Sequence, residues 1–310
     1  MAHSQLGTVV VGGGTGFIGT ALCNILRKTG YDVVVVSRVP GPYCVTWGEL
    51  ETTGLPRSTV AVVNLAGQNI LDKKRSWTPG FQQTVRASRI NTTLSLVKAI
   101  KEAEFKPKVF VSTSGVGYYP PSPVKEYTEE SEGGSGDYFA SLCTDWEAAA
   151  QIPAETGVRT VVIRSGVVLG RRGGMISELY HPFFFGLGGP VGNGQQYFPW
   201  IHIKDIARLF QFSIENDQVR GTLNGVAPHI ITNKEFASAF GRSLWRPAVI
   251  PLPTFVFDKL FGPERAKMIT QGQKVIPKRT LAYNFQYQYP DISSACDEFS
   301  VLAYVDDLSP

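Results

Sequence analysis

The stretch Thr8-Val-Val-Val-Gly-Gly-Gly-Thr-Gly-Phe-Ile-Gly19 joins an apolar run to a glycine-rich segment, and the amphipathic run Thr20-Ala-Leu-Cys-Asn-Ile-Leu-Arg-Lys28 follows without a break. This order predicts a strand, a tight turn and a helix. Glycine suits the turn because it adopts backbone angles that a Cβ penalises and lets the main chain approach a ligand closely. The free amides at the start of such a helix face a diphosphate, so a dinucleotide site is favoured over a plain turn. The contacting residues would be Gly13, Thr15, Gly16, Phe17 and Ile18.

The next predicted strand, Asp32-Val-Val-Val-Val-Ser-Arg38, indicates which dinucleotide binds. In this architecture the end of the second strand meets the adenosine ribose, where an acidic residue would bind the 2′-hydroxyl and exclude a 2′-phosphate. Here the strand ends in Ser37 and Arg38, and Asp32 lies at the wrong end to reach the ribose. A guanidinium suits a phosphate and Ser37 adds a hydroxyl donor, so NADP(H) is favoured over NAD(H). The alternative is a solvated arginine in a loop.

Short β-branched runs alternate with helical patterns in the first half of the chain, which is typical of a parallel sheet with crossover helices. The predicted fold is α/β, a Rossmann-type doubly wound parallel sheet with a smaller C-terminal substrate lobe. We expect residues 7–168 to form the NADP-binding domain and residues 169–310 mainly the lobe, with some segments returning to the sheet. The acidic segment Tyr119–Asp137 should be an exposed loop whose carboxylates form only a solvated face. Predicted strands are Val9–Val11, Val33–Ser37, Val60–Leu65, Val109–Thr113 and Thr160–Arg164; predicted helices are Phe17–Lys28, Phe81–Glu104, Tyr138–Ala150 and Lys204–Glu215.

The composition is typical of an ordinary globular enzyme. Of 310 residues, 43% are hydrophobic and 18% charged, and the formal net charge is +4. No dense basic segment alternates with aromatic residues, which argues against a nucleic-acid partner. The four cysteines and four histidines are dispersed without metal-ligand spacing, so we expect neither a metal site nor disulfides. No apolar run approaches the roughly 18 residues of a membrane span, and the N-terminus lacks a signal pattern, so the expected location is the cytoplasm, with mitochondria or nucleus left open.

Four further motifs are similar to those of extended or atypical short-chain dehydrogenase/reductases. Asn64-Leu-Ala-Gly67 resembles the family's Asn-Asn-Ala-Gly element, and Ser112-Thr-Ser114 resembles its Ser-Ser-Ser element. Arg164-Ser-Gly-Val-Val-Leu-Gly170 resembles Arg-Pro-Gly-x-x-Tyr-Gly, and His202-Ile-Lys-Asp205 resembles His-Val-x-Asp. The resemblance implies that the first element lies beside the adenine and its ribose, the second holds the catalytic serine and the third lies near the nicotinamide. The residues so implied are Asn64, Leu65, Ala66, Gly67, Ser112, Ser114, Ser165 and Val167.

The resemblance covers roughly residues 7–300 and narrows to one subgroup. Trp146-Glu-Ala-Ala-Ala150, Phe198-Pro-Trp-Ile-His202 and Gly272-Gln-Lys-Val-Ile-Pro-Lys-Arg-Thr280 resemble the nucleotide-sugar epimerase-like subgroup, called cell-division-inhibitor-like in bacteria and represented in animals by family thirty-nine U. This subgroup implies an NADP-dependent oxidoreductase of unsettled substrate. Arg89 stands where the family usually has an asparagine near the cofactor; it would contact the pyrophosphate or a ribose, unless it forms a salt bridge on the helix surface. The superfamily also implies a homodimer through the helices Phe81–Glu104 and Tyr138–Ala150.

One expected residue is missing. Enzymes of the resembled family use a Tyr-x-x-x-Lys pair, in which the lysine lowers the tyrosine pKa and binds the nicotinamide ribose. The pair is expected about 25 residues after the serine, where this chain has Asp137-Tyr-Phe-Ala-Ser-Leu-Cys-Thr-Asp-Trp-Glu147. Tyr138 is followed four residues later by Leu142, and in the neighbouring frame Phe139 is followed by Cys143. Neither frame supplies a lysine.

Two functions remain open from the sequence. In the first, the protein is an NADP(H)-dependent oxidoreductase or epimerase-like enzyme for a small polar substrate. Ser114 would orient a carbonyl and Tyr138 would be the acid, with an unidentified group in place of the lysine. In the second, it is a sensor or regulator that binds NADP(H) with little or no catalysis, and Tyr138 only lines the nicotinamide pocket. A complete cofactor motif without a proton relay favours the sensor, whereas a full substrate lobe favours the enzyme.

Overall fold

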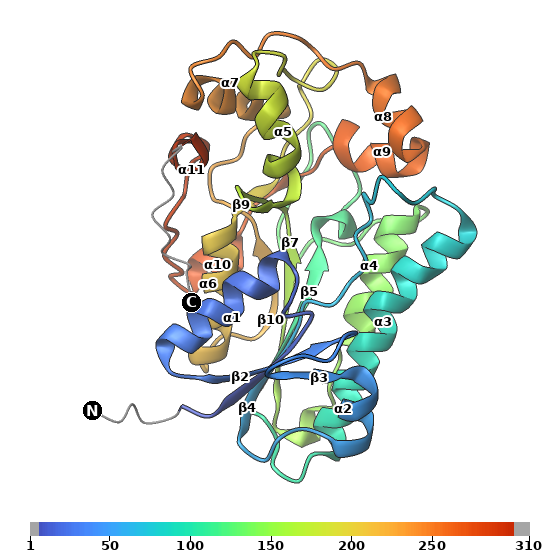
Figure 1. Cartoon of the computed structure of the whole chain (residues 1–310), viewed down its shortest axis with the longest axis vertical. Coiled ribbons are helices and arrows are strands. Elements are labelled where there is room, and N and C mark those ends of the chain that lie inside the picture. Colours follow the sequence, from blue (N-terminus) through green and yellow to red (C-terminus); the bar gives the residue numbers. More distant parts are fainter. Residues whose placement is uncertain (1–5, 301–310) are drawn as a thin grey trace.

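A computed structural model describes residues 6–300. Its centre is a seven-stranded sheet in the order β10-β7-β5-β4-β1-β2-β3, in which every neighbouring pair is parallel. The predicted α/β class and doubly wound parallel sheet are confirmed (Figure 1). The strands are β1 (Thr8–Gly12), β2 (Asp32–Ser37), β3 (Cys44–Thr46), β4 (Thr59–Asn64), β5 (Val109–Gly115), β7 (Arg159–Ser165) and β10 (Gly221–Gly225).

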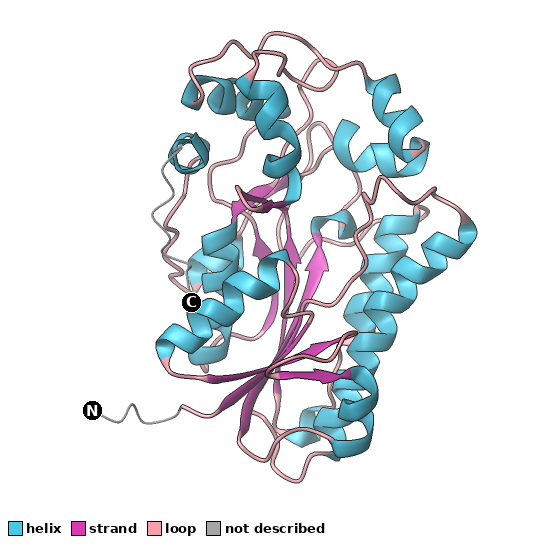
Figure 2. Ribbon diagram, in the orientation of Figure 1, coloured by secondary structure: helices cyan, strands magenta, loops and turns pink. Residues whose placement is uncertain are grey.

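Helices cover both faces of the sheet (Figure 2). On one face lie α1 (Phe17–Thr29) and α6 (Ile203–Glu215); on the other lie α2 (Trp47–Thr53), α3 (Pro79–Glu102) and α4 (Tyr138–Ala149). Side chains of β1 alternate between the two layers, since Val9 and Val11 pack with α1 and α6 while Val10 packs with α2 and α3. Apolar residues on both faces of a strand therefore specify a central, fully covered position.

A smaller lobe stands beyond the carboxyl ends of the strands (Figure 1). Its core is rich in aromatic residues, including Phe183, Trp200, Phe236, Phe240 and Phe299. The lobe contains α5 (Gly174–Phe184), α7 (Asn233–Ser243), α8 (Thr254–Phe261), α9 (Pro263–Thr270), α11 (Ile292–Ser300) and the paired strands β8 (Val167–Gly170) and β9 (Trp200–His202). Beneath it lie η1 (Val116–Tyr118), η2 (Ala154–Thr156), α10 (Lys278–Ala282) and the paired strands β6 (Glu126–Tyr127) and β11 (Lys274–Val275).

Each strand and helix named from the sequence is present, with ends shifted by a few residues. Within the large sheet and the helices that cover it, three elements were not named from the sequence: β3, α2 and β10. The pattern of β10, Gly-Thr-Leu-Asn-Gly, has few β-branched residues, so its place in the sheet comes from pairing with β7 and not from propensity. The short helix α2 did carry a signal, because Thr46 and Glu49 form a capping box. Two segments from the second half of the chain belong to the large sheet unit: β10 is one of its strands, and α6 covers one of its faces. The proposed domain boundary at residues 168 and 169 stays a prediction.

The expectation that the carboxylates of the segment 119–137 form only a solvated face is wrong for Glu129. Its side chain is buried and accepts hydrogen bonds from the amides of Asn224 (3.1 Å) and Arg279 (3.1 Å). A buried carboxylate in this place fixes β10 and the following C-terminal segment to the loop.

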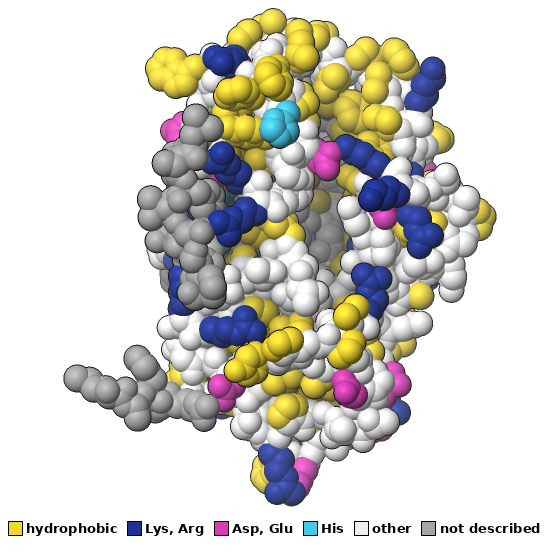
Figure 3. Space-filling model, viewed as in Figure 1, with side chains coloured by type: hydrophobic (Ala, Val, Ile, Leu, Met, Phe, Trp, Pro, Cys, Tyr) yellow, Lys and Arg dark blue, Asp and Glu magenta, His cyan; other side chains and the backbone are white. Residues whose placement is uncertain are grey.

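Within residues 6–300 no helix is both long and apolar enough to cross a membrane, and no group of three or more His, Cys, Asp or Glu side chains is arranged to hold a metal ion. Lys and Arg side chains lie on both sides of a recess in the middle of the face drawn in Figure 3. Because opposite charges attract, such a recess suits an anionic ligand.

Candidate cofactor and active site

The glycine turn lies where the carboxyl ends of β1, β2 and β4 meet. Gly13 has a φ of +76°, and a Cβ there would lie 2.7 Å from the amide nitrogen of Ala66. A Cβ on Gly19 would lie 2.7 Å from the Cα of Gly14. Both positions therefore require glycine, the first for its backbone angles and both for close packing of the turn.

The first turn of α1 is open to a ligand. Gly16 is its N-cap, no side chain caps the helix, and no acidic residue lies in the first turn. Thr15 and Gly16 are exposed, and Phe17 and Ile18 are half-buried. Helix geometry leaves the first amides of a helix without intrahelical partners, so these amides can donate to an anion. The ring of Phe17 lies against the segment 170–174, which joins the turn to the start of α5.

The tip of β2 lies beside this turn. Gly12 is in register with Val36, and the amide of Gly13 donates to the carbonyl of Val36 (3.0 Å). The hydroxyl of Ser37 is partly used by its own turn, since it accepts from the amide of Val39 (3.1 Å) and also contacts that residue's carbonyl. Arg38 is exposed and makes no ion pair with the residues between 6 and 300. Arg38 directly follows the last residue of β2, so it lies beyond the strand end.

Asn64 shapes the next loop instead of presenting its amide to a ligand. Its side chain is fully buried, donates to Thr93 Oγ1 (2.7 Å) and accepts from the amide of Ala66 (3.1 Å). Leu65 donates its amide to the carbonyl of Gly12 (2.8 Å), which ties the loop to the glycine turn. Leu65 is half-buried and Gly67 exposed, so contacts with an adenosine would come from the loop's main chain and these two residues.

Arg89 is buried between α3 and α4, and the surface salt bridge considered from the sequence is absent within the described range 6–300. Its Nη1 donates to the carbonyls of Gln68 (3.0 Å) and Val85 (3.1 Å), and the guanidinium carbon lies 5.2 Å from the ring centre of Trp146. Burial lowers the pKa of Arg89 to about 10, which still leaves it charged at neutral pH.

Three serines lie at the ends of β5 and β7. Ser112 is buried, and its hydroxyl has only a long bond to the carbonyl of Thr113 (3.4 Å). Ser165 donates to the carbonyl of Gly166 (2.9 Å), and Val167 beside it is half-buried. The hydroxyl of Ser114 is buried and makes no hydrogen bond of normal length and angle with residues 6–300, although it lies close enough to the thiol of Cys143 to lower the pKa of that thiol. A buried hydroxyl without a partner costs free energy, so Ser114 is the natural donor to a bound carbonyl.

The structure separates the two frames that the sequence left open on α4. Tyr138 donates its hydroxyl to the carbonyl of Gln82 on α3 (2.7 Å), and Leu142 packs with α3 as well. Phe139 and Cys143 face the other way: a Cβ on Gly117 would lie 3.5 Å from Phe139 Cβ, and one on Gly115 would lie 3.7 Å from the sulfur of Cys143. The helix face toward the end of β5 therefore carries Phe139 and Cys143, and the hydroxyl of Tyr138 is turned toward α3.

Neither helix face supplies a base at neutral pH. Burial raises the pKa of the Cys143 thiol to about 11, and the nearby charge of Glu147 acts in the same direction. Burial also raises the pKa of Tyr138, although the charges of Arg89 and Arg86 oppose it. Both groups are thus protonated, and they can donate but not abstract a proton.

A buried polar network behind the site was not foreseen from the sequence. Glu147 accepts two hydrogen bonds from Arg164, from Nε (2.8 Å) and Nη2 (2.8 Å), and Nη1 of Arg164 donates to the hydroxyl of Tyr119 (2.8 Å). Tyr119 Oη in turn lies 2.9 Å from Asn224 Oδ1. The guanidinium carbon of Arg164 lies 3.4 Å from the ring centre of Tyr118. Glu147 belongs to the motif 146–150 and Arg164 to the motif 164–170. Their separation along the chain does not show that the two side chains are in contact.

Residues 70–78, which we call the strap, belong to the loop after β4 and contact two helices of the lobe. Arg265 of α9 donates to the carbonyls of Ile70 (3.1 Å) and Asp72 (3.2 Å), and Glu264 accepts from the indole of Trp77. On the other side Lys73 forms an ion pair with Glu178 of α5. Through these contacts the loop after β4 is tied to both α5 and α9 of the lobe.

His202 is the N-cap of α6. Its Nδ1 accepts from the amide of Lys204 (3.1 Å), and its ring is fully buried against Tyr289 and Phe299. It is therefore a residue of the lobe's core and not a substrate contact.

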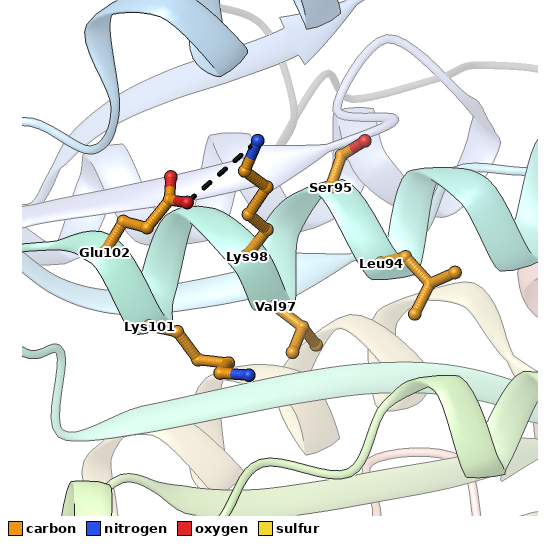
Figure 4. Close-up of a pocket in the computed structure, with 6 residues that line it drawn as sticks. All are labelled: Leu94, Ser95, Val97, Lys98, Lys101 and Glu102. Atoms are coloured by element: carbon orange, nitrogen blue, oxygen red, sulfur yellow. Dashed lines mark ion pairs between the residues drawn. The ribbon is translucent and has the colours of Figure 1, made fainter.

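A shallow groove of about 600 Å³ follows the outer side of α3 (Figure 4). Because α3 runs back from the carboxyl ends of the strands, this groove lies toward their amino ends and is not the cofactor site. It is lined by Leu94, Ser95, Val97, Lys98, Lys101 and Glu102.

The sequence matches the NAD dependent epimerase/dehydratase family over residues 9–224 and a domain of unknown function, DUF1731, over residues 252–299. Epimerase family protein SDR39U1 of Bos taurus is 52% identical over 291 residues, which cover 94% of this chain and 98% of the relative. The chloroplastic SDR39U1 homolog of Arabidopsis thaliana is 36% identical, with 94% and 86% covered.

Solved structures agree with this match. The crystal structure of human SDR39U1 with NADPH superimposes with a TM-score of 0.92 at 52% identity, covering 94% of this chain and 99% of that one. A nucleoside-diphosphate sugar epimerase of Corynebacterium glutamicum has a TM-score of 0.76 at 26% identity, covering 98% of this chain and 60% of that one.

Proposed function

The chain belongs to the NAD dependent epimerase/dehydratase family, and on that premise we propose that it is an NADP(H)-dependent oxidoreductase or epimerase-like enzyme for a small polar substrate. The observation that carries this proposal is the buried hydroxyl of Ser114 at the end of β5, which makes no hydrogen bond of normal geometry within residues 6–300 and lies on the same sheet edge as an open glycine turn. Hydride transfer requires a bound nicotinamide cofactor next to a hydrogen-bond donor for the substrate's carbonyl oxygen. The glycine turn and Ser114 lie on the same edge of the sheet and could supply these two parts.

The residues fit NADP(H). The open first turn of α1 would hold the diphosphate through the amides around Thr15, Gly16, Phe17 and Ile18, with Gly13 allowing the close approach. Arg38 would hold the 2′-phosphate, with Ser37 beside it. NADPH is the ligand of the human relative's crystal structure, which supports this choice. The loop from Leu65 to Gly67 would line the adenosine, and Ser112, Ser165 and Val167 would line the path toward the nicotinamide.

The chain's own residues would orient the substrate and exclude water. When bound, NADP(H) would supply or accept the hydride. Ser114 would donate a hydrogen bond to the oxygen that gains negative charge, which strengthens as that charge develops. Tyr138 is turned toward α3 in this structure, so its part as the acid stays a prediction that requires its hydroxyl to leave Gln82.

A sensor that binds NADP(H) is the second candidate, and a specific observation favours it. The face of α4 beside β5 carries Phe139 and Cys143 in place of the tyrosine and lysine of the resembled family. Phenylalanine has no exchangeable proton and the thiol is neutral, so this face has no proton relay.

Turnover separates the two candidates. We expect the purified protein to oxidise NADPH in the presence of at least one member of a panel of small carbonyl compounds, and Ser114→Ala to lower kcat/KM roughly 100-fold, because one oxyanion donor contributes about 2.7–4 kcal/mol. Absorbance of NADPH at its nicotinamide band measures the rate. Thr113→Val is the matched control, since Thr113 is also buried on β5 and its removal should leave the rate within about twofold. Tight NADPH binding without turnover on any carbonyl would contradict the enzyme and support the sensor.

We also infer a homodimer through α3 and α4. The outer side of α3 exposes 49% of Leu94 beside the shallow groove described above, so this side chain is one at which the inferred dimer can be tested. The variant Leu94→Glu should therefore have the mass of one chain by light scattering while the wild type has that of two. Leu260→Glu on α8 is the control, because Leu260 is 54% exposed but lies in the lobe. A wild type that elutes as a single chain would refute this surface.

A further inference from the structure

A closed circuit of contacts runs around the carboxyl ends of β1 and β4. The amide of Leu65 donates to the carbonyl of Gly12 (2.8 Å), which joins the loop after β4 to the glycine turn. That loop continues into the strap, where Lys73 forms an ion pair with Glu178 of α5. The first residue of α5 lies against the ring of Phe17, which opens α1 directly after the glycine turn. The circuit therefore returns to the turn from which it began.

The order of the strands places the two ends of a bound cofactor on opposite sides of this circuit. The ends of β1 and β4 form its floor, and these strands are the middle pair in the order β5-β4-β1-β2. Arg38 follows β2 on one side, and Ser114 lies at the end of β5 on the other. A dinucleotide that reaches from Arg38 to Ser114 would cross the ends of β1 and β4. It would thus pass between this floor and the ion pair of Lys73 with Glu178.

The ion pair is the weakest link of the circuit. The strap is held firmly to α9, since Arg265 is only 2% exposed and donates to the carbonyls of Ile70 (3.1 Å) and Asp72 (3.2 Å). The side chains of Lys73 and Glu178, by contrast, are 55% and 59% exposed. Solvent-exposed ion pairs contribute little free energy. This link can therefore break and form again without any change in the folded core.

We propose that Lys73 and Glu178 form a clasp that opens to let the cofactor in and out and thereby limits the rate at which NADP(H) exchanges. The clasp rests on the proposed binding of NADP(H) and adds a kinetic role for two residues that need not touch the cofactor. Because the pair would be closed both before the ligand enters and after it is bound, it stabilises the free and the bound protein alike. Its loss should therefore change the barrier between them and leave the affinity nearly unchanged.

Neutralising either partner should speed up both binding and release. We expect Lys73→Gln and Glu178→Gln each to raise the association and dissociation rate constants of NADPH by the same factor, roughly two- to fivefold, because an exposed pair adds little to a barrier. The double reversal Lys73→Glu/Glu178→Lys restores an ion pair and should return both rate constants close to those of the wild type. Stopped-flow fluorescence of NADPH on the full chain measures association by mixing and dissociation by displacement with excess NADP+.

The neighbouring residue Lys74 provides the matched control. It is exposed and forms no ion pair in the part of the chain that the structure describes, so Lys74→Gln removes the same charge from the strap without opening the clasp. Its rate constants should equal those of the wild type.

The charge reversal distinguishes the clasp from a direct contact between Lys73 and a phosphate of the cofactor. A direct contact predicts weaker NADPH binding in Lys73→Gln, no weakening in Glu178→Gln and no rescue by the double reversal, and this result would overturn the clasp. Unchanged rate constants in both single variants would overturn it as well. A wild type that does not bind NADPH would refute the proposed cofactor, and the clasp with it.

Discussion

Replacing Glu147 with alanine should lower the free energy of unfolding by about 3–5 kcal/mol, the largest stability effect that we expect of a single side chain here. Glu147 and Arg164 are 13% and 5% exposed, and two hydrogen bonds of 2.8 Å join them. Burial alone would lower the pKa of Arg164, but the hydrogen bonds and charge of Glu147 outweigh this and raise it. Without the carboxylate, the guanidinium stays buried beside Tyr118 and Tyr119 with its charge uncompensated.

Urea denaturation measures this effect as a lower midpoint with an unchanged slope. The matched control is the ion pair between Arg57 and Glu104, whose bond of 2.9 Å is almost as short but whose side chains are 80% and 65% exposed. Glu104→Ala should cost no more than about 1 kcal/mol, because solvent screens an exposed pair. The double variant Glu147→Leu/Arg164→Met should be more stable than the sum of the two single changes predicts, since it removes both charges. Equal costs for Glu147→Ala and Glu104→Ala would show that burial does not strengthen the first pair.

Local patterns were sufficient to predict the glycine turn and the end of β2 from the sequence. The turn needs glycine at Gly13 and Gly19, and the end of β2 at Ser37, just before Arg38, follows from the length of one apolar run. Parallel strands then bring both to the same edge, because the carboxyl ends of such strands coincide. These features depend on residues that are only a few positions apart in the sequence, and at such short separations the spacing of residues is a reliable guide to structure.

The rest of the site depends on how helices are rotated and paired, which spacing does not determine. Tyr138 and Phe139 are adjacent, and a rotation of 100° per residue decides which of them faces β5. The packing of Leu142 against α3 fixes that rotation, and it assigns the face to Phe139 and Cys143. In the same way, the sequence placed Arg89 near the cofactor. That its side chain is buried with no carboxylate beside it within residues 6–300 follows from the packing of α4 against α3, which the sequence does not reveal. The pair Glu147–Arg164 spans two elements and has no local signature.

Replacing Arg38 with aspartate should remove the preference for NADPH over NADH. The wild type should bind NADPH at least tenfold more tightly, since a guanidinium at the end of β2 can form charge-assisted bonds with the 2′-phosphate, worth about 1.5–3 kcal/mol. In Arg38→Asp those bonds are lost and a carboxylate repels the phosphate, so NADPH binding should weaken roughly 10- to 100-fold. The same carboxylate can accept from the 2′-hydroxyl of NADH, so NADH binding should be unchanged or tighter. Quenching of tryptophan fluorescence measures both affinities.

Two controls, a change of salt concentration and a second variant, distinguish direct contact of Arg38 with the 2′-phosphate from long-range attraction of NADPH by the protein's positive charge. Arg220 is exposed and immediately precedes β10, so it lies at the amino ends of the strands, and Arg220→Asp changes the net charge as Arg38→Asp does. If long-range attraction alone were responsible, both variants would bind NADPH more weakly by a similar factor. Raising the salt concentration would then abolish the difference in affinity between NADPH and NADH. Direct contact predicts a loss in Arg38→Asp only, with part of the preference kept at high salt because close pairs are screened less. A wild type with equal affinity for the two cofactors would refute the assignment of NADP(H), although the glycine turn would still bind a dinucleotide. On this proposal Arg38 would decide which cofactor binds, whereas the turn would decide that one does.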